Sequence, residues 1–240
     1  MTLNSEKKQS AGSGYRWAFF DLDGTLVDSG EGITNSVAFA LRHFGMTAPK
    51  EELYRFIGPP LVDSFMRFYG FSREQAGEAV DVYRIRYRDV GVHENILYPG
   101  IRELLDELVS AGVRPVLATS KPEVFANIVL RDMEIADRFY YVAGAELDDA
   151  EGRKRKLRLN KDEVVAYALA SCGARPDETV MIGDREYDIE GAKKNGVGSI
   201  GVLFGYGSRE ELENAGADYI AKTPADVARI ILGNTEEDGL

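Results

Sequence analysis

The sequence predicts an α/β fold with a parallel-sheet core and an inserted α-helical cap. Three observations support this prediction: short apolar runs recur along the chain, helical patterns separate them, and residues 30–97 carry helical patterns alone. Strands that alternate with helices are typical of a parallel sheet with helices on both faces. We therefore expect residues 15–29 and 98–232 to form the core, and residues 30–97 to form a cap inserted after the first strand.

Each expected strand is a short apolar run, and several of these runs stop at a polar residue or at glycine. Runs of about four to eight apolar residues between turn signals are consistent with buried strands. The expected strands are Trp17–Phe20, Val113–Ala118, Phe139–Ala143, Thr179–Ile182, Ser199–Leu203 and Tyr219–Ala221.

The expected helices are marked by apolar residues spaced three or four positions apart. In the core, such stripes begin after Pro99-Gly100, after Pro122 and at Val164. Residues 30–97 carry three further stripes, which predict a small helical bundle. Their members are Ile33, Val37, Leu41 and Phe44; Leu61, Phe65, Phe68 and Tyr69; and Ala76, Val80, Tyr83 and Tyr87. Packing is the commoner cause of such aromatic stripes, and the lining of a ligand pocket is the alternative.

Composition and charge narrow the class of protein. The formal net charge is −11 over 240 residues, so neither nucleic acid nor an anionic membrane is expected as a main partner. No apolar stretch reaches the ~18 residues that a membrane helix needs. The single cysteine, Cys172, cannot form an intramolecular disulfide, which fits a reducing cytoplasm. We expect a cytoplasmic monomer with a disordered segment at 1–14 and an acidic tail at 233–240.

Two carboxylates follow the first expected strand, those of Asp21 and Asp23. Carboxylates two residues apart leave a strand on the same side. Asp21 can attack phosphorus while Asp23 handles the proton of the leaving group. The alternative is an acidic turn in which Gly24 lets the chain reverse after the strand.

A second acidic group follows the fourth expected strand. Asp184 comes directly after Gly183, and Asp188 lies four residues later, on the same face if a helix starts there. Carboxylate oxygens suit Mg²⁺, which takes one or two carboxylates together with water and substrate oxygens. Helix capping by Asp184 explains the same pattern equally well.

Candidate phosphate-binding groups come from two other parts of the chain. Thr119 and Ser120 end the second expected strand, where a hydroxyl and the amides of a helix start can bind an anion; capping of a helix near Pro122 is the alternative. Lys161 precedes an apolar helix and can hold a phosphate oxygen, although a lone lysine is more often solvated. Like charges ~4 Å apart cost about 4 kcal/mol at an effective dielectric of ~20, so phosphate needs a divalent cation and a lysine here.

With these motifs in order, the chain resembles the haloacid dehalogenase (HAD) superfamily, in its phosphoglycolate phosphatase-like branch with a helical cap. The matching motifs are Asp21–Ser29, Thr119 within Leu117–Pro122, Lys161 with Asp162–Val165, and Gly183–Asp188 with Gly191-Ala192. The resemblance covers roughly residues 15–232 and implies a Rossmann-like parallel-sheet core.

The resemblance also implies a role for each candidate residue. Asp21 forms an aspartyl-phosphate, and Asp23 protonates the leaving oxygen and then activates water. Mg²⁺ is held by the Asp21 carboxylate, the backbone carbonyl of Asp23 and Asp184, with support from Asp188. The phosphoryl group is held by Thr119, Ser120 and Lys161. The cap closes over the core and selects the substrate, a small phosphorylated metabolite.

The Gly183–Asp188 motif, together with Gly201–Ser208 and Ile57–Pro60, is similar to a bacterial 5′-nucleotidase-like subgroup. This resemblance favours nucleoside 5′-monophosphates over phosphoglycolate or a sugar phosphate. A base could stack on aromatic side chains of the cap. These are Phe56, Phe65 and Phe68. Most of the cap arginines are expected on the solvent face. The candidates are Arg55, Arg67, Arg84, Arg86 and Arg88.

One stretch departs from the family pattern. Relatives carry a short glycine-rich stretch before the third-motif lysine, whereas Glu146–Asn160 is longer and contains the basic cluster Arg153–Arg158. Lys156 is therefore an alternative to Lys161. The cluster is expected to be a solvated loop, and guidance of anionic substrates is the alternative.

Other activities known on this fold fit the sequence less well. A dehalogenase does not need Asp23, and a phosphonatase needs a cap lysine, of which residues 30–97 contain only Lys50, near a helix start. A phosphomutase shares the nucleophile and the metal and stays open. A binding protein on an inactive phosphatase fold is opposed by the intact acidic set.

Overall fold

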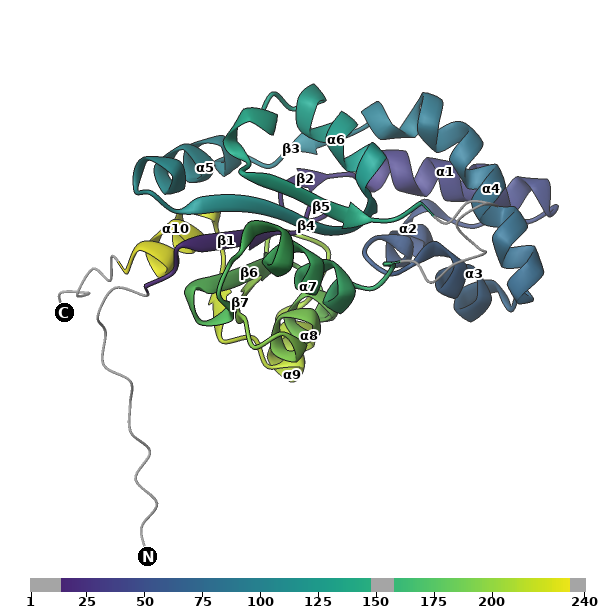
Figure 1. The fold of residues 1–240 in the computed structure, drawn as a ribbon. Coiled ribbons are helices and arrows are strands. Elements are labelled where there is room, and N and C mark those ends of the chain that lie inside the picture. The colour runs from purple at the N-terminus through teal and green to yellow at the C-terminus, as the bar shows by residue number, and fades with distance from the viewer. Residues whose placement is uncertain (1–13, 148–157, 234–240) are drawn as a thin grey trace, which may run out of the picture.

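The computed structural model describes residues 14–147 and 158–233. At its centre lies a parallel six-stranded sheet with the strand order β5-β4-β1-β6-β7-β8 (Figure 1). The strands are β1 (Trp17–Phe20), β4 (Arg114–Pro122), β5 (Tyr141–Ala145), β6 (Thr179–Gly183), β7 (Gly198–Val202) and β8 (Tyr219–Ala221). The predicted α/β fold with a Rossmann-like parallel sheet is confirmed.

Strand β1 lies in the middle of the sheet, and its side chains are buried on both faces. Trp17 and Phe19 pack into one apolar cluster, whereas Phe20 packs into the other, as the two-residue period of a strand requires. In the parallel register, Phe20 lies beside Leu117 of β4 and Ile182 of β6. The residues that follow these three positions therefore meet at one edge of the sheet.

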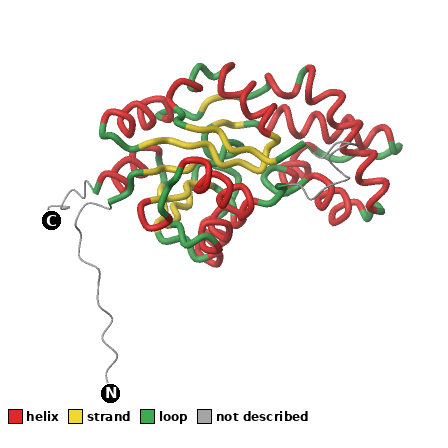
Figure 2. The backbone as a smooth tube through the Cα atoms, in the orientation of Figure 1, coloured by secondary structure: helices red, strands yellow, loops and turns green. Residues whose placement is uncertain are grey.

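Helices cover both faces of the sheet, as Figures 1 and 2 show. One face is covered by α7 (Lys161–Cys172), α8 (Glu186–Lys194) and α9 (Arg209–Ala215). The other is covered by α5 (Ile101–Ser110), α6 (Glu123–Asp132) and α10 (Pro224–Leu232). Burial of the apolar stripes against the sheet supplies most of the stabilisation, at about 25 cal/mol per Å² of apolar surface.

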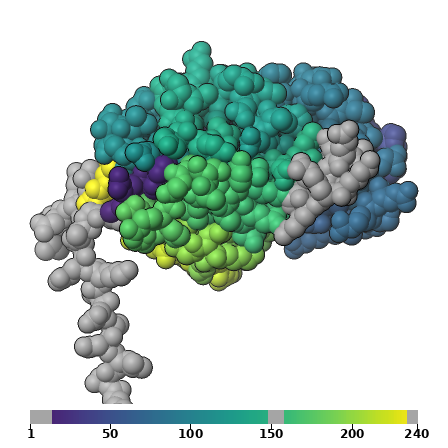
Figure 3. Space-filling view, viewed as in Figure 1, coloured from purple at the N-terminus to yellow at the C-terminus, as the bar shows by residue number. Residues whose placement is uncertain are grey.

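Residues 30–97 form a helical layer at one end of the molecule, shown in blue in Figure 3. Its helices are α1 (Gly30–His43), α2 (Lys50–Leu53), α3 (Leu61–Tyr69) and α4 (Arg73–Asp89). Helices α1 and α3 both pack against α4, and Val37, Phe65 and Val80, one from each predicted stripe, are buried. The bounds of this cap as a domain stay a prediction.

Three local features differ from the sequence-based expectation. Residues 30–97 were expected to lack strands, but β3 (Ile96–Leu97) pairs antiparallel with β2 (Val27–Asp28), so the chain enters and leaves the cap side by side. A two-residue strand is too short to leave a periodic signal. Strand β5 starts two residues later than expected, because Phe139 packs its ring against Phe20 before the chain joins the sheet.

The second strand is longer than expected. Residues Thr119 to Lys121 continue β4, and α6 begins only at Glu123, with Pro122 as its N-cap. The expectation that Thr119 and Ser120 sit at a helix start is therefore wrong. A residue before proline is driven toward extended backbone, which explains why the strand runs on to this point.

Candidate active site

Asp21 leaves β1 at the carboxyl edge of the sheet, where its backbone N–H donates to Ile182 O at 2.9 Å. A tight turn follows, in which the N–H groups of Leu26 and Val27 both bond to Leu22 O. Gly24 has φ +83°, and an added Cβ there would overlap the Asp184 carboxylate. Only glycine lets the first motif approach the fourth this closely.

Lys161, at the start of α7, lies inside the acidic group rather than at the surface. Its Nζ atom is 2.7 Å from Asp21 Oδ1 and 2.8 Å from Asp188 Oδ1, and it donates to Ala118 O at 3.0 Å. Burial works against the charge of Lys161, but Asp188 and Asp21 outweigh burial and raise its pKa. A cation at a helix N-terminus is unfavourable, so the carboxylates of Asp21 and Asp188 stabilise the Lys161 ammonium group at the start of α7. The solvated-surface alternative for Lys161 is wrong.

Asp184 is completely buried. Its carboxylate accepts hydrogen bonds from Thr25 Oγ1 at 3.2 Å and from the Tyr206 backbone N–H at 2.8 Å. Burial, and then the charges of Asp188 and Asp21, raise the pKa of Asp184 well above its usual range. The residue at the N-cap of α8 is Arg185, so the capping alternative for Asp184 is wrong.

Asp188 does take part in capping, because Oδ2 accepts a hydrogen bond from the Arg185 N–H at 3.1 Å. Burial raises the pKa of Asp188 to about 6, with Lys161 opposing the shift and Asp21 adding to it. Its Oδ1 atom faces Lys161. Asp188 therefore combines capping with membership of the acidic group.

The acidic group fits a divalent cation. Asp21, Asp184 and Asp188 each offer a carboxylate oxygen, and these atoms all lie within 4.8 Å of one another. Metal binding requires all three carboxylates to be ionised. In that state they carry three negative charges against the one positive charge of Lys161, which leaves a deficit of two positive charges. A buried charge imbalance of this size is very costly unless a cation balances it. The all-oxygen donor set is the one that Mg²⁺ prefers.

Asp23 does not join that group. Both of its carboxylate oxygens accept hydrogen bonds from Lys121 Nζ, at 2.6 and 2.7 Å. Lys121 is buried and also lies 5.2 Å from the ring centroid of Tyr87 in the cap. Sequence reasoning gave Lys121 no role, although this residue lies within the second motif, Leu117–Pro122.

Thr119 and Ser120 lie at the same edge of the sheet. Thr119 is buried, and its hydroxyl accepts a hydrogen bond from the Lys121 backbone N–H at 3.2 Å. Ser120 lines both of the cavities described below. The structure thus brings all of the predicted site residues to one edge.

The alternative lysine, Lys156, lies outside the described residues, as does most of the basic cluster. Arg158 is described, and it is not solvated. Its guanidinium lies 3.7 Å from the Tyr167 ring centroid, and its Nε donates to Gly144 O at 3.0 Å. At this position, the solvated-loop expectation is wrong.

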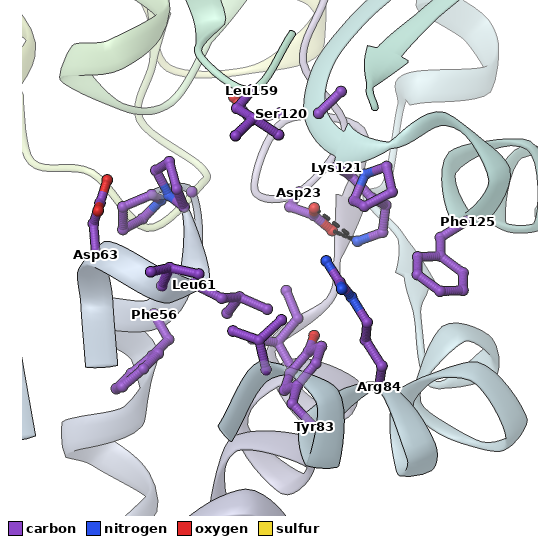
Figure 4. Close-up of a pocket in the computed structure, with 18 of the residues that line it drawn as sticks. Asp23, Phe56, Leu61, Asp63, Tyr83, Arg84, Ser120, Lys121, Phe125 and Leu159 are labelled. Atoms are coloured by element: carbon purple, nitrogen blue, oxygen red, sulfur yellow. Dashed lines mark hydrogen bonds and ion pairs between the residues drawn. The ribbon is translucent and has the colours of Figure 1, made fainter. Parts of the chain in front are cut away.

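A cavity of about 320 Å³ lies between the cap and the core, beside Asp23 (Figure 4). One wall is mostly apolar and includes Phe56 and Leu61, while Arg84 points from α4 toward the Asp23–Lys121 pair. Arg84 therefore departs from the expected solvent-facing pattern. Phe65 is fully buried and packs against Phe56 and Phe71, so it cannot stack on a base.

A second cavity, of about 380 Å³, reaches Lys161. It lies between α3 of the cap and α7 and α8 of the core, as its lining residues Phe68, Asp162 and Tyr187 show. Gly58, Pro59 and Pro60 line both cavities, so this turn of the cap separates them.

The chain has a parallel α/β core, a carboxylate directly after the central strand, an acidic group with a buried lysine, and a helical cap. Together these features define a HAD-type phosphatase. A family model described as "Haloacid dehalogenase-like hydrolase" matches residues 18–202, and the chain belongs to that family. Among the described residues, no helix is both long and apolar enough to cross a membrane.

Individual relatives refine the comparison. A 5′-nucleotidase of Pseudomonas aeruginosa is 46% identical over 80% of this chain and 85% of that protein. The tyrosine-protein kinase PtkA of Mycobacterium tuberculosis is 38% identical over 92% of this chain and 70% of that protein. The crystal structure of a predicted phosphatase from Clostridium acetobutylicum matches with a TM-score of 0.85 and 43% identity, covering 91% of this chain and 98% of that one.

Proposed function

We propose that this phosphatase is Mg²⁺-dependent and hydrolyses small phosphomonoesters, nucleoside 5′-monophosphates foremost, through an aspartyl-phosphate on Asp21. The observation that carries the proposal is the buried group of Asp21, Asp184 and Asp188, in which Lys161 contacts Asp21 and Asp188. That group has the oxygen ligands and the charge deficit that a divalent cation would correct. One of its members, Asp21, is the proposed nucleophile.

In the proposed reaction, an Asp21 oxygen bonds to phosphorus as the bond to the leaving oxygen breaks. Asp23 gives its proton to that oxygen, and the alcohol departs into the cap cavity, which Asp23 lines. Water then attacks the phosphoryl group and gives a proton back to Asp23. Phosphate is released and the Asp21 carboxylate is restored.

The metal would be held by Asp21 and Asp184, with the Asp23 backbone carbonyl as a further ligand and Asp188 in support. When bound, Mg²⁺ supplies positive charge that offsets the phosphate dianion and the charge that builds up in the transition state. Lys161 adds one fixed positive charge, and Thr119 and Ser120 add hydroxyl donors. These groups hold and orient the phosphoryl oxygens.

Nucleoside 5′-monophosphates are favoured for two reasons. The cap cavity of about 320 Å³ falls in the size range of pockets that hold drug-sized ligands, so it can hold a nucleoside. The 5′-nucleotidase from P. aeruginosa shares 46% identity with this chain. Phosphoglycolate and sugar phosphates are the alternative substrates. A phosphomutase, or a kinase such as the tyrosine-protein kinase PtkA, would transfer the phosphoryl group to an acceptor other than water.

The proposed cellular setting is cytoplasmic, and the proposed state is a monomer. The cytoplasmic setting rests on the single cysteine, which fits a reducing compartment.

The function is tested with Asp21→Asn. An amide is a poor nucleophile and a poor metal ligand, so turnover of AMP and UMP should fall by roughly four or more orders of magnitude while the fold is kept. In the wild-type protein, phosphate released should equal nucleotide consumed, and rapid acid quench should trap phosphate on Asp21. Substantial Mg²⁺-dependent turnover by a pure Asn variant, or trapped phosphate on another residue, would refute this mechanism.

A further inference from the structure

The cap turn Ile57–Pro60 is one of the parts of the cap that lie beside the acidic end of the sheet. Gly58, Pro59 and Pro60 border both cavities that lead to the site. Ile57 is completely buried, and its carbonyl accepts a hydrogen bond from Arg185 Nη1 at 2.7 Å. A shift of this turn would therefore change the lining of both cavities at once.

Arg185 connects this turn to the candidate metal ligands. It directly follows Asp184, and its own backbone N–H donates to Asp188 Oδ2 at 3.1 Å. Its Nε atom donates to Glu211 Oε1 at 2.7 Å, and the same oxygen accepts from the Glu186 backbone N–H at 3.0 Å. The guanidinium of Arg185 thus donates to Glu211 of α9 through Nε and to Ile57 of the cap through Nη1. Only arginine has a planar group with separate N–H donors that can contact both partners in this way.

The glycines around Arg185 permit this close approach. Gly58 has φ +104°, and an added Cβ would lie only 3.1 Å from Arg185 Cγ. An added Cβ at Gly207 would overlap the Asp184 carbonyl oxygen. A side chain at Gly58 would push the cap away from Arg185, and one at Gly207 would push its own loop away from the turn that carries Asp184 and Arg185.

We propose that Arg185 is a positioning residue that couples cap closure to metal binding at Asp184 and Asp188. One short turn presents both the two ligands and the guanidinium, so a cation that fixes the turn also fixes the contact with Ile57. Coupling between two equilibria is reciprocal, so a closed cap must favour the metal by the same factor. The metal half of this inference rests on the proposed function, whereas the contact with the cap stands without it.

The test is amide hydrogen exchange of residues 54–61, with and without Mg²⁺, combined with calorimetric titration of Mg²⁺. In the wild-type protein, Mg²⁺ should slow exchange in this segment. In Arg185→Met, exchange there should rise about tenfold, because a hydrogen bond from a charged group is lost. Mg²⁺ should no longer slow it, and the Kd for Mg²⁺ should rise about fivefold or more. Arg175→Met is the matched control, since Arg175 is exposed and pairs only with Asp177 among the described residues.

Arg185→Lys keeps the positive charge but cannot contact Glu211 and Ile57 at the same time, so its exchange at 54–61 should be intermediate. It also provides a folded variant if Arg185→Met unfolds. Exchange at 54–61 equal to wild type in both variants would overturn the proposed contact. An undiminished Mg²⁺ effect in the variants, or no Mg²⁺ binding by the wild-type protein, would overturn the coupling. Neither readout uses turnover. A protein that binds Mg²⁺ and shows the coupling but leaves nucleotides intact would refute the proposed function alone.

Discussion

The Nζ atom of Lys121 bridges both carboxylate oxygens of Asp23, at 2.6 and 2.7 Å. This contact directs Asp23 to the cap cavity, whereas Asp21, two residues earlier, faces Lys161. The two aspartates of the first motif therefore have different cationic partners and different surroundings. This difference in surroundings is consistent with different roles, in which Asp21 is the nucleophile and Asp23 is the acid/base.

The first prediction follows from the position of Asp23 beside the cap cavity. Asp23→Asn removes the proton donor, so kcat for an alkyl phosphate such as AMP should fall by about 10²–10⁴. The loss should be much smaller for p-nitrophenyl phosphate, because nitrophenolate leaves without a proton. Mg²⁺ binding, measured by calorimetry, should be kept, since the proposed metal contact of this residue is its backbone carbonyl. Equal losses for the good and the poor leaving group would argue against the acid/base role.

The second prediction concerns the identity of the metal. EDTA should abolish activity and Mg²⁺ should restore it, whereas Ca²⁺ should restore little. Ca²⁺ binds oxygen ligands at longer distances and with a looser geometry, which would misplace the Asp21 oxygen relative to phosphorus. The measurement is the initial rate after dialysis and addition of each ion. Comparable rescue by the two ions would contradict a tight octahedral site.

The third prediction concerns pH. Burial raises the pKa of Asp188 to about 6, so in the metal-free protein the folded state holds a proton there that the unfolded state releases. Protonation of Asp188 therefore adds to the free energy of unfolding of the metal-free protein as the pH falls through about 6. This contribution is lost as the pH rises above that value. Mg²⁺ must displace this proton, and also the proton favoured by the raised pKa of Asp184, so its affinity should fall by about tenfold or more per pH unit below that value.

Thermal unfolding with and without Mg²⁺ at pH 5, 6 and 7 checks this third prediction. Saturating Mg²⁺ raises Tm through preferential binding to the folded state, and the rise should be largest at pH 7 and smallest at pH 5. The control ion is Na⁺ at matched ionic strength, which should leave Tm nearly unchanged at each pH. A rise in Tm that is the same at pH 5 and pH 7 would show that no proton competes with the metal.

Much of the fold could be predicted because apolar runs and helical stripes are local features of the sequence. Strands β1 and β6 are buried along their whole length, and their short apolar runs predicted this burial. The edge at which Asp21, Thr119 and Asp184 meet follows from the parallel order of the strands. The β2–β3 pair was not predicted because two residues are too few to leave a periodic signal. The end of β4 was placed too early, although Pro122 favours extended backbone in the residue before it.

The electrostatic partners of the site were harder to predict than its carboxylates. Lys121 and Lys161 both belong to recognisable motifs, yet nothing local distinguishes a buried lysine from a solvated one. Their burial depends on carboxylates that lie 98 and 140 positions away, as the pairs Lys121–Asp23 and Lys161–Asp21 show. Arg84 could not be assigned for the same reason: a helical pattern does not reveal which side of α4 faces the cavity across the cap–core boundary.

The last prediction concerns the choice of substrate, which the phosphoryl-binding groups cannot make. Arg84 has 19% of its side-chain surface exposed and points into the cap cavity. Its guanidinium can only donate hydrogen bonds, so it should bind acceptor oxygens of the leaving group. Arg84→Met should therefore lower kcat/KM for AMP and UMP by about tenfold, mainly through KM, since a hydrogen bond to a charged group is lost. Turnover of p-nitrophenyl phosphate should change by less than about twofold.

Arg88→Met is the matched control for this last prediction, because Arg88 lies on the same helix with 65% of its side chain exposed. It should leave every substrate unaffected. The deciding comparison is kcat/KM for AMP, UMP, phosphoglycolate and a sugar phosphate, in the wild-type protein and in both variants. If phosphoglycolate exceeds every nucleotide by about tenfold, which corresponds to ~1.4 kcal/mol of transition-state binding, and Arg84→Met removes that advantage, then Arg84 binds a carboxylate. In that case the nucleotide preference is wrong, and the cap selects a compact anionic leaving group.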